Sequence, residues 1–162
     1  MFIQTLSAMT SILLKDNSVP SGMTRKVGDR GELLAAEYLV SQGYRLVMSN
    51  FSVPIGRSAT GAQITGEIDV VAIDNGILCF IEVKTRMSDR FAGPLAAVDL
   101  RKQRQIIRAA RAYRKVFGIA GLAFRYDVVT VLLTDPRKPV IEVVQGFWSE
   151  SKFKKRSWSE EH

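Results

Sequence analysis

Apolar and polar positions divide this chain of 162 residues into helical and extended segments. Helical spacing predicts a first helix from about Asp29 to Ser41 and a longer one from Ala96 or Asp99 to Phe117. Apolar runs of strand length predict extended segments at 44–51, on both sides of 74–76, at 122–133 and at 140–145. Strand pairs around two helices predict an α/β domain with a mixed sheet.

The dipeptide Asn75-Gly76 between two apolar runs predicts a β-hairpin with a two-residue loop. In that register Asp69 faces Glu82, and Lys84 lies on the same face two residues further on. A three-residue loop is the alternative, and it would place Asp69 opposite Ile81. The register therefore decides whether two acidic side chains meet.

Two carboxylates about 5 Å apart repel each other, and a divalent cation between them removes the repulsion. The Asp69 and Glu82 pair therefore predicts a Mg²⁺ or Mn²⁺ site, in which Lys84 contacts the attacking water or the phosphate. This arrangement suits hydrolysis of phosphodiester bonds. The alternative is an ordinary hairpin with polar residues at its open end.

The segments Gly66–Ala72 and Phe80–Arg86 resemble the signature of the YraN-type bacterial proteins. That family is assigned to the restriction-endonuclease-like, PD-(D/E)xK superfamily, near the archaeal Holliday-junction resolvases. The resemblance runs from about Gly28 to Leu133. The connection Ser52–Thr65 departs from it, because it is longer and mostly neutral where the family has a short basic one.

The resemblance implies an α/β restriction-endonuclease-like domain over residues 26–147, with a mixed β-sheet flanked by helices. It implies a metal-dependent nuclease that acts on structured or branched DNA; a non-catalytic nucleic-acid-binding module and a protein-interaction adaptor are the alternatives. The metal ligands would be Asp69, Glu82 and the carbonyl of Val83, with Mg²⁺ or Mn²⁺ as the cofactor, and the further site residues would be Lys84, Glu32 and Lys102.

Glu32 and Lys102 each have a second interpretation. Glu32 starts an apolar helical stripe, where it faces inward toward the hairpin or stays in solvent and complements the helix dipole. Lys102 shares a helix side with Ile106 and Tyr113, so its ammonium group points toward the body of the fold. There it completes the site or extends past the helix start into water.

The second helix also carries basic residues at steps of three and four, without an acidic residue between Asp99 and Phe117. Such uncompensated charge favours contact with nucleic-acid phosphates, against a solvated face or an acidic protein partner. Its members are Arg101, Arg104, Arg108, Arg111 and Lys115, and Arg86 adds a basic residue in the loop after the hairpin. Asp127 is predicted to be a structural acid paired with a basic group.

The net charge of +7 favours a polyanionic partner, with DNA the first candidate. One cysteine, Cys79, and one histidine, His162, exclude a disulfide framework, a cysteine-rich zinc site and histidine-based catalysis. No apolar run approaches about 20 residues, so no membrane contact and a cytoplasmic location are expected. Residues 1–25 are predicted to be a poorly ordered extension and 148–162 a basic tail, and a homodimer is left open.

Overall fold

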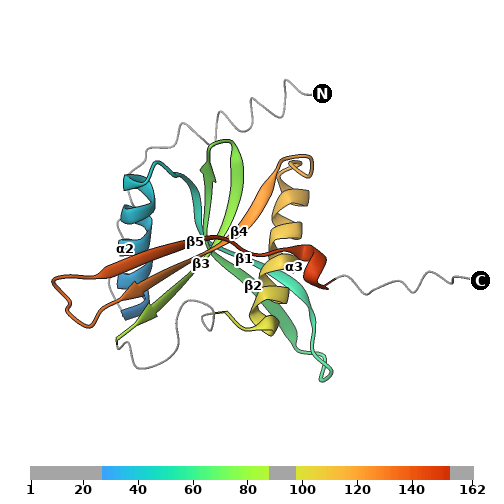
Figure 1. Ribbon diagram of the computed structural model, residues 1–162. Helices are drawn as coiled ribbons and strands as arrows, with labels where there is room; N and C mark the ends of the chain where they lie inside the picture. The colour runs from blue at the N-terminus through green and yellow to red at the C-terminus, as the bar shows by residue number, and fades with distance from the viewer. Residues whose placement is uncertain (1–26, 88–97, 154–162) are drawn as a thin grey trace, which may run out of the picture.

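The computed structural model describes residues 27–87 and 98–153 of the chain (Figure 1). The predicted extension at 1–25, most of the loop after Arg86 and most of the predicted tail lie outside these residues. The described elements, in chain order, are α2 (Val27–Ser41), β1 (Arg45–Arg57), β2 (Gln63–Asp74), β3 (Ile77–Arg86), α3 (Leu100–Val116), β4 (Phe124–Leu132), β5 (Val140–Trp148) and the 3-10 helix η2 (Glu150–Phe153).

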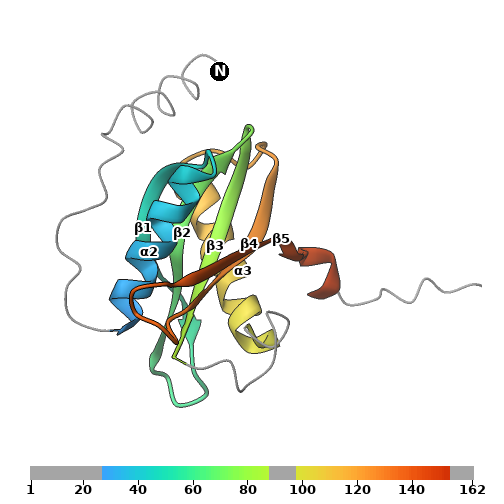
Figure 2. The ribbon, with the colours of Figure 1, turned by 60° about the vertical axis from the view of Figure 1, so that its left-hand side comes forward.

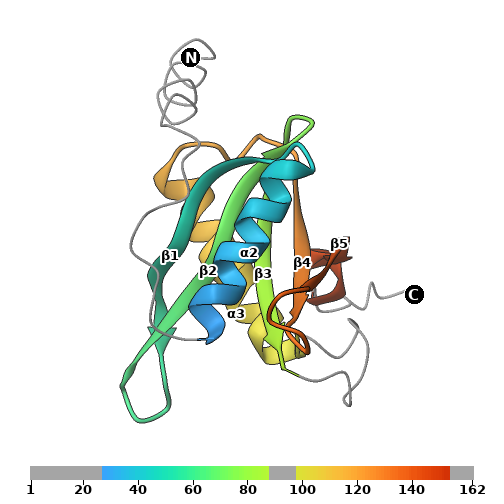
Figure 3. The same ribbon diagram turned by 90° about the vertical axis from the view of Figure 1, so that its left-hand side faces the viewer.

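In the described part of the chain, five strands form one sheet in the order β1-β2-β3-β4-β5. Strands β3 and β4 pair in parallel, and the other neighbours pair antiparallel. Helix α3 makes the crossover that the parallel pair requires. Helices α2 and α3 cover opposite faces of the sheet (Figures 2 and 3). This mixed sheet between helices is the predicted α/β arrangement and is compatible with a restriction-endonuclease-like fold.

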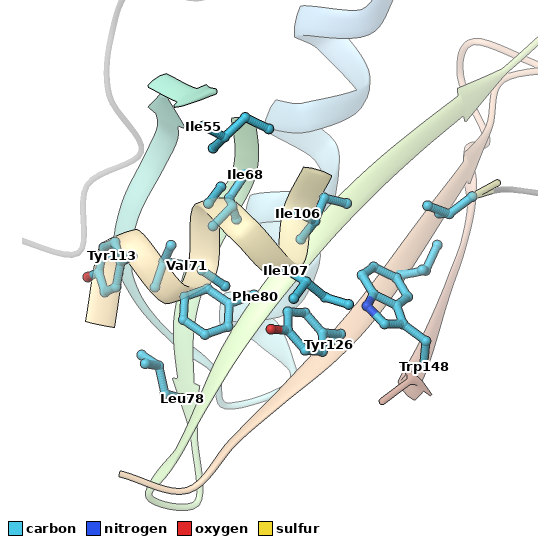
Figure 4. Close-up of a cluster of buried hydrophobic side chains, with 14 of the residues drawn as sticks. Ile55, Ile68, Val71, Leu78, Phe80, Ile106, Ile107, Tyr113, Tyr126 and Trp148 are labelled. Carbon is cyan, nitrogen blue, oxygen red and sulfur yellow. The ribbon is translucent and has the colours of Figure 1, made fainter. Parts of the chain in front are cut away.

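The alternation of side chains along β3 divides the core into two clusters. Phe80 faces α3, where it packs edge-on against Tyr113 in the larger cluster (Figure 4). Cys79 and Ile81 belong to the smaller cluster beneath α2, where both are fully buried. Val116 is 68% exposed and lies outside the buried side of α3.

The β2–β3 hairpin has the predicted two-residue loop. Asn75 and Gly76 both have positive φ, at 47° and 80°, as a type I′ turn requires. Asp74 pairs with Ile77, and the ladder continues in the same register until Val70 pairs with Ile81. The three-residue alternative, with Asp69 opposite Ile81, is therefore wrong.

The paired register of β2 and β3 ends at Val70 and Ile81, one residue before Asp69. There the carboxylate of Asp69 accepts a hydrogen bond from the backbone N–H of Val83, with 2.7 Å between Oδ2 and N. A side chain thus takes the place of the next backbone partner. From that point the two strands separate (Figure 3). The predicted metal ligands Asp69 and Glu82 directly follow the last paired residues of this ladder.

The Ser52–Thr65 connection is mostly strand, not loop. Strand β1 continues to Arg57, beyond the predicted end at Phe51, and pairs with β2 from Gln63 onward. Alternation explains the extension, because Ile55 and the preceding Val53 both pack in the core beneath α3. Pro54 is tolerated because β1 is an edge strand.

The last strand also runs further than its apolar pattern suggested. Strand β5 ends at Trp148, so the predicted domain boundary at residue 147 lies inside it. Trp148 is 6% exposed, and its ring stacks on Tyr126 at 5.1 Å between centroids. The 3-10 helix Glu150–Phe153 follows directly. The described fold therefore includes the start of the predicted tail.

Candidate metal centre and basic surface

Glu82 is the buried centre of the candidate site. It lies on β3, and only 2% of its side chain is exposed. The ammonium nitrogen of Lys84 lies 2.9 Å from its Oε1, and that of Lys102 lies 3.5 Å from its Oε2. Lys84 comes from the same strand two residues on, and Lys102 comes from the first turn of α3. The structure thus brings together three predicted site residues, and Lys102 points into the fold as expected.

The start of α3 positions Lys102. Asp99 caps the helix, and its carboxylate accepts the backbone N–H of Lys102, with 2.8 Å between the atoms. Gln103, the next residue, is buried and donates from Nε2 to the carbonyl of Val98 at 2.8 Å. These two contacts fix the helix start over the end of β3. They were not part of the sequence prediction, although Asp99 had the residue type of an N-cap.

Asp69 is the second acidic residue of the site. Burial first, and the negative charge of Glu82 second, raise its pKa to about 7. The Val83 hydrogen bond and the charge of Lys102 act in the opposite sense, and Glu32 adds a smaller upward effect. A carboxyl group held above its ordinary pKa by burial and by a neighbouring carboxylate is a common feature of functional sites.

Glu32 reaches the site because α2 packs unusually close to β3. Gly31 is buried, and a Cβ built on it would overlap the hydroxyl oxygen of Thr85. Only glycine allows this approach. Thr85 directly follows Lys84, so α2 places Glu32 near the same end of β3, where its charge acts on Asp69. The packing role of Gly31 was not predicted; a small residue before an acidic one was its only signal.

The donor set fits a hard divalent cation. Oε2 of Glu82 is buried without a hydrogen-bond partner, and its ion pair with Lys102 at 3.5 Å offsets only part of the cost of burying it. Asp69 and Glu82 are the carboxylates, and Val83, which follows Glu82 and donates its N–H to Asp69, could contribute its carbonyl. Within 27–87 and 98–153, no cluster of three or more acidic, histidine or cysteine side chains could hold a metal alone. Two carboxylates with water and substrate oxygens match the preference of Mg²⁺.

The five basic residues predicted on α3 are all exposed, and we call them the basic stripe: Arg101, Arg104, Arg108, Arg111 and Lys115. Three of them have contacts within the protein. Arg104 lies over the ring of Phe153 at 5.2 Å, Arg108 donates to the carbonyl of Ile55, and Arg111 binds Glu150. The stripe thus holds the neighbouring hairpin and the C-terminal segment as well as presenting charge. Arg86 ends β3 and is half-buried.

A second polar cluster lies on the α2 face of the sheet. Asp127 is fully buried, and it accepts from Arg125 Nε at 2.9 Å and from the backbone of Gly146 at 2.9 Å. Arg125 also donates to Asp74 at 2.7 Å and to the hydroxyl of Tyr44 at 3.0 Å. The prediction that Asp127 is a structural acid paired with a basic residue is confirmed. This cluster joins β2, β4 and β5 and is separate from the candidate metal centre.

Comparison with known proteins places these residues in a family. The model of the uncharacterised protein family UPF0102 matches residues 31–131. A UPF0102 protein of Trichlorobacter lovleyi is 44% identical over 117 residues, which cover 72% of this chain and 84% of that protein. Another, of Chlorobium limicola, is 37% identical over 131 residues, with 77% and 94% covered. Both the Asp69 hairpin and the start of α3 lie inside the matched region.

Among solved structures, the crystal structure of SSO0001 aligns with 93% of this chain and 64% of its own. The TM-score is 0.37 at 17% identity, too low to support an argument about fold or function. Within the described residues, no helix is long and apolar enough to cross a membrane.

Proposed function

Because the chain belongs to the UPF0102 family, the YraN family that its motifs resemble, we propose a function that its own site can perform: metal-dependent hydrolysis of phosphodiester bonds by a nuclease. We propose Mg²⁺ or Mn²⁺ as the cofactor and structured or branched DNA as the substrate. One observation carries the proposal: a buried carboxylate, one of whose oxygens has no hydrogen bond, lies beside a second carboxylate and two lysines where the paired ladder of two strands ends.

The proposed ligands are Glu82, Asp69 and the Val83 carbonyl. A bound divalent cation would supply positive charge to polarise the phosphodiester and to lower the pKa of an attacking water. Glu82 contributes an oxygen that the fold leaves without a hydrogen bond. Asp69 is held in place by the Val83 N–H, so its carboxylate is already oriented when the cation arrives.

The two lysines would act on the substrate. Lys84 and Lys102 are each about one-third exposed, at 35% and 28%, so each ammonium group can reach a ligand from solvent. Lys84 would orient the attacking water and stabilise charge on the phosphate oxygens as the bond breaks. Lys102, at the start of α3, would hold a phosphate oxygen. Glu32 would support a second cation or position a water from the α2 side.

The experiment is a titration of Mg²⁺ and Mn²⁺ against labelled duplex, flap, four-way junction and single-stranded substrates. We expect cleavage that depends on the cation and that is lost in Glu82→Gln. This variant removes the charge but keeps the shape. Glu37→Gln on the outer side of α2 is the matched control, because it makes the same chemical change on an exposed residue away from the site. Equal cleavage by both variants would refute the site.

Choice of DNA form is the finer part of the proposal. It rests on the resemblance of the hairpin motif to that of the Holliday-junction resolvases. A preference for junctions or flaps over linear duplex of the same length would support it. Cleavage of all forms at equal rates would leave a nuclease of no structural preference.

One observation favours a second candidate, a nucleic-acid-binding module that does not cleave. Both lysines are engaged with Glu82, and the Asp69 carboxylate is engaged by Val83, so the charges are balanced without a cation. Strong DNA binding without cleavage under any cation would select this candidate. A third candidate, an adaptor for an acidic protein, predicts that binding to DNA is absent.

A further inference from the structure

The C-terminal segment presents an acidic side chain to the basic flank of α3. Glu150 is the first residue of η2 and lies two positions after Trp148, the last residue of β5. Its Oε2 lies 2.7 Å from Nη2 and 3.1 Å from Nε of Arg111. Its Oε1 lies 3.1 Å from Nη2 of Arg114. The carboxylate is therefore held by two arginines of α3, nine and twelve residues after the site residue Lys102 on the same helix.

A third donor completes this pocket. The hydroxyl of Tyr126, on β4, donates to Oε1 of Glu150 at 2.8 Å. Tyr126 is 1% exposed and the side chain of Arg114 is 13% exposed, so both donors are fixed by packing. Arg114 lies over the ring of Phe124 at 3.8 Å, and its Nε is buried without a hydrogen-bond partner. The Nε–H of Arg114 is therefore a donor in this pocket that Glu150 leaves without an acceptor.

The electrostatics of the pocket favour a negative charge. Burial alone would raise the pKa of Glu150, yet the Arg111 and Tyr126 hydrogen bonds and the two arginine charges leave it below its ordinary value. A carboxylate and a phosphate diester each present two oxygens that share one negative charge, so both can accept from the same pair of donors. Arginine pairs bind both groups in the same bidentate manner.

We propose that Arg111, Arg114 and Tyr126 form a phosphate-binding subsite that Glu150 occupies from within the chain, and that a nucleic-acid phosphate displaces it. The proposal deepens the proposed function, on which it rests for DNA as the polyanion. It assigns the C-terminal half of α3 to substrate binding and makes η2 a competitor for the same donors. Arg104 lies seven residues before Arg111, about 10 Å along the helix, so a strand bound there could reach both.

The main alternative is a purely structural clamp. In that case Glu150 fastens η2 to α3, and the arginines have no other ligand. The two interpretations predict different effects on DNA affinity when the charge of Glu150 is removed. A clamp loses stability and leaves DNA affinity unchanged, whereas an occupied subsite gains affinity when its internal occupant is weakened.

The test compares Glu150→Gln with Glu37→Gln, which changes the net charge equally on the opposite helix. DNA affinity is measured by fluorescence anisotropy in EDTA, so that cleavage plays no part, across a range of salt concentrations. We expect Glu150→Gln to bind several-fold more tightly than the control. The plot of log K against log salt should steepen by about 0.7–0.9, the value of one added phosphate contact. Adding Arg111→Ala to Glu150→Gln should remove the gain.

A second measurement does not depend on DNA. The melting temperature of Glu150→Gln should rise with inorganic phosphate more than that of Glu37→Gln, because a ligand that binds the folded state stabilises it. Equal phosphate response and equal DNA affinity in the two variants would overturn the subsite, as would weaker DNA binding by Glu150→Gln. Loss of cleavage with these gains intact would count against the nuclease alone. Cleavage without them would count against the subsite alone.

Discussion

Replacing Asp69 with asparagine should stabilise the metal-free protein at neutral and alkaline pH. The substitution removes a carboxyl group whose pKa is raised to about 7 by burial and by Glu82. An asparagine side-chain oxygen can still accept the Val83 N–H, so the hydrogen bond at the end of the β2–β3 ladder is kept. The comparison therefore isolates the free energy that the ionisable carboxyl group of Asp69 costs the folded protein.

The sign follows from proton binding. The folded protein holds the Asp69 proton up to about pH 7, whereas the unfolded chain releases it near the ordinary value of 3.8. Asp69 thus contributes most favourably below about pH 4, and that contribution is lost as the pH rises toward and through 7. The loss is about 1.4 kcal/mol per pH unit near pH 5 and half that at the pKa, so it amounts to about 2 kcal/mol between pH 5 and pH 7. The advantage of Asp69→Asn should grow by that order.

The assay is guanidinium unfolding in EDTA at several pH values from 5 to 8, for wild type and Asp69→Asn. The difference in unfolding free energy between the proteins should widen as the pH rises. Mg²⁺ or Mn²⁺ should then stabilise wild type at pH 8 and have little effect on the variant. Parallel pH profiles, or a variant that is less stable than wild type at pH 8, would refute the electrostatic reasoning for the site.

Three further outcomes test other parts of the structure. Lys84→Met should reduce single-turnover cleavage by orders of magnitude with little change in DNA affinity, because the lysine acts on the transition state; a proportional loss of affinity would make it a phosphate anchor only. Arg101→Ala with Lys115→Ala should flatten the salt dependence of DNA binding by about 0.7–0.9 for each charge removed, and an unchanged slope would exclude both from the binding surface. Gly31→Ala should cost about 1–3 kcal/mol of unfolding free energy, because its methyl group overlaps Thr85, and a smaller Thr85→Ala partner should restore part of the loss. No loss in the single variant would show that α2 can shift without cost.

Local pattern determined much of this protein. The Asn75-Gly76 loop fixed the hairpin register, because a two-residue loop with positive φ at both positions allows one pairing only. The helical period separated the buried side of α3 from its basic stripe, and the same period turned Lys102 inward toward Glu82. Each of these depends on residues within one or two elements. For that reason the sequence by itself could predict them.

Tertiary structure decided the features that join distant segments. The sequence gives no local signal that Arg111 binds Glu150, 39 residues away, or that Arg108 binds the Ile55 carbonyl, 53 residues away. The register also could not show that the β2–β3 ladder ends at Val70, because that end depends on Asp69 replacing a backbone partner. Basic residues on a helix surface follow from its period, whereas their partners follow from packing between elements. The sequence therefore determined which side chains lie on the surface of each helix, and the tertiary structure decided which of them already bind a partner within the protein.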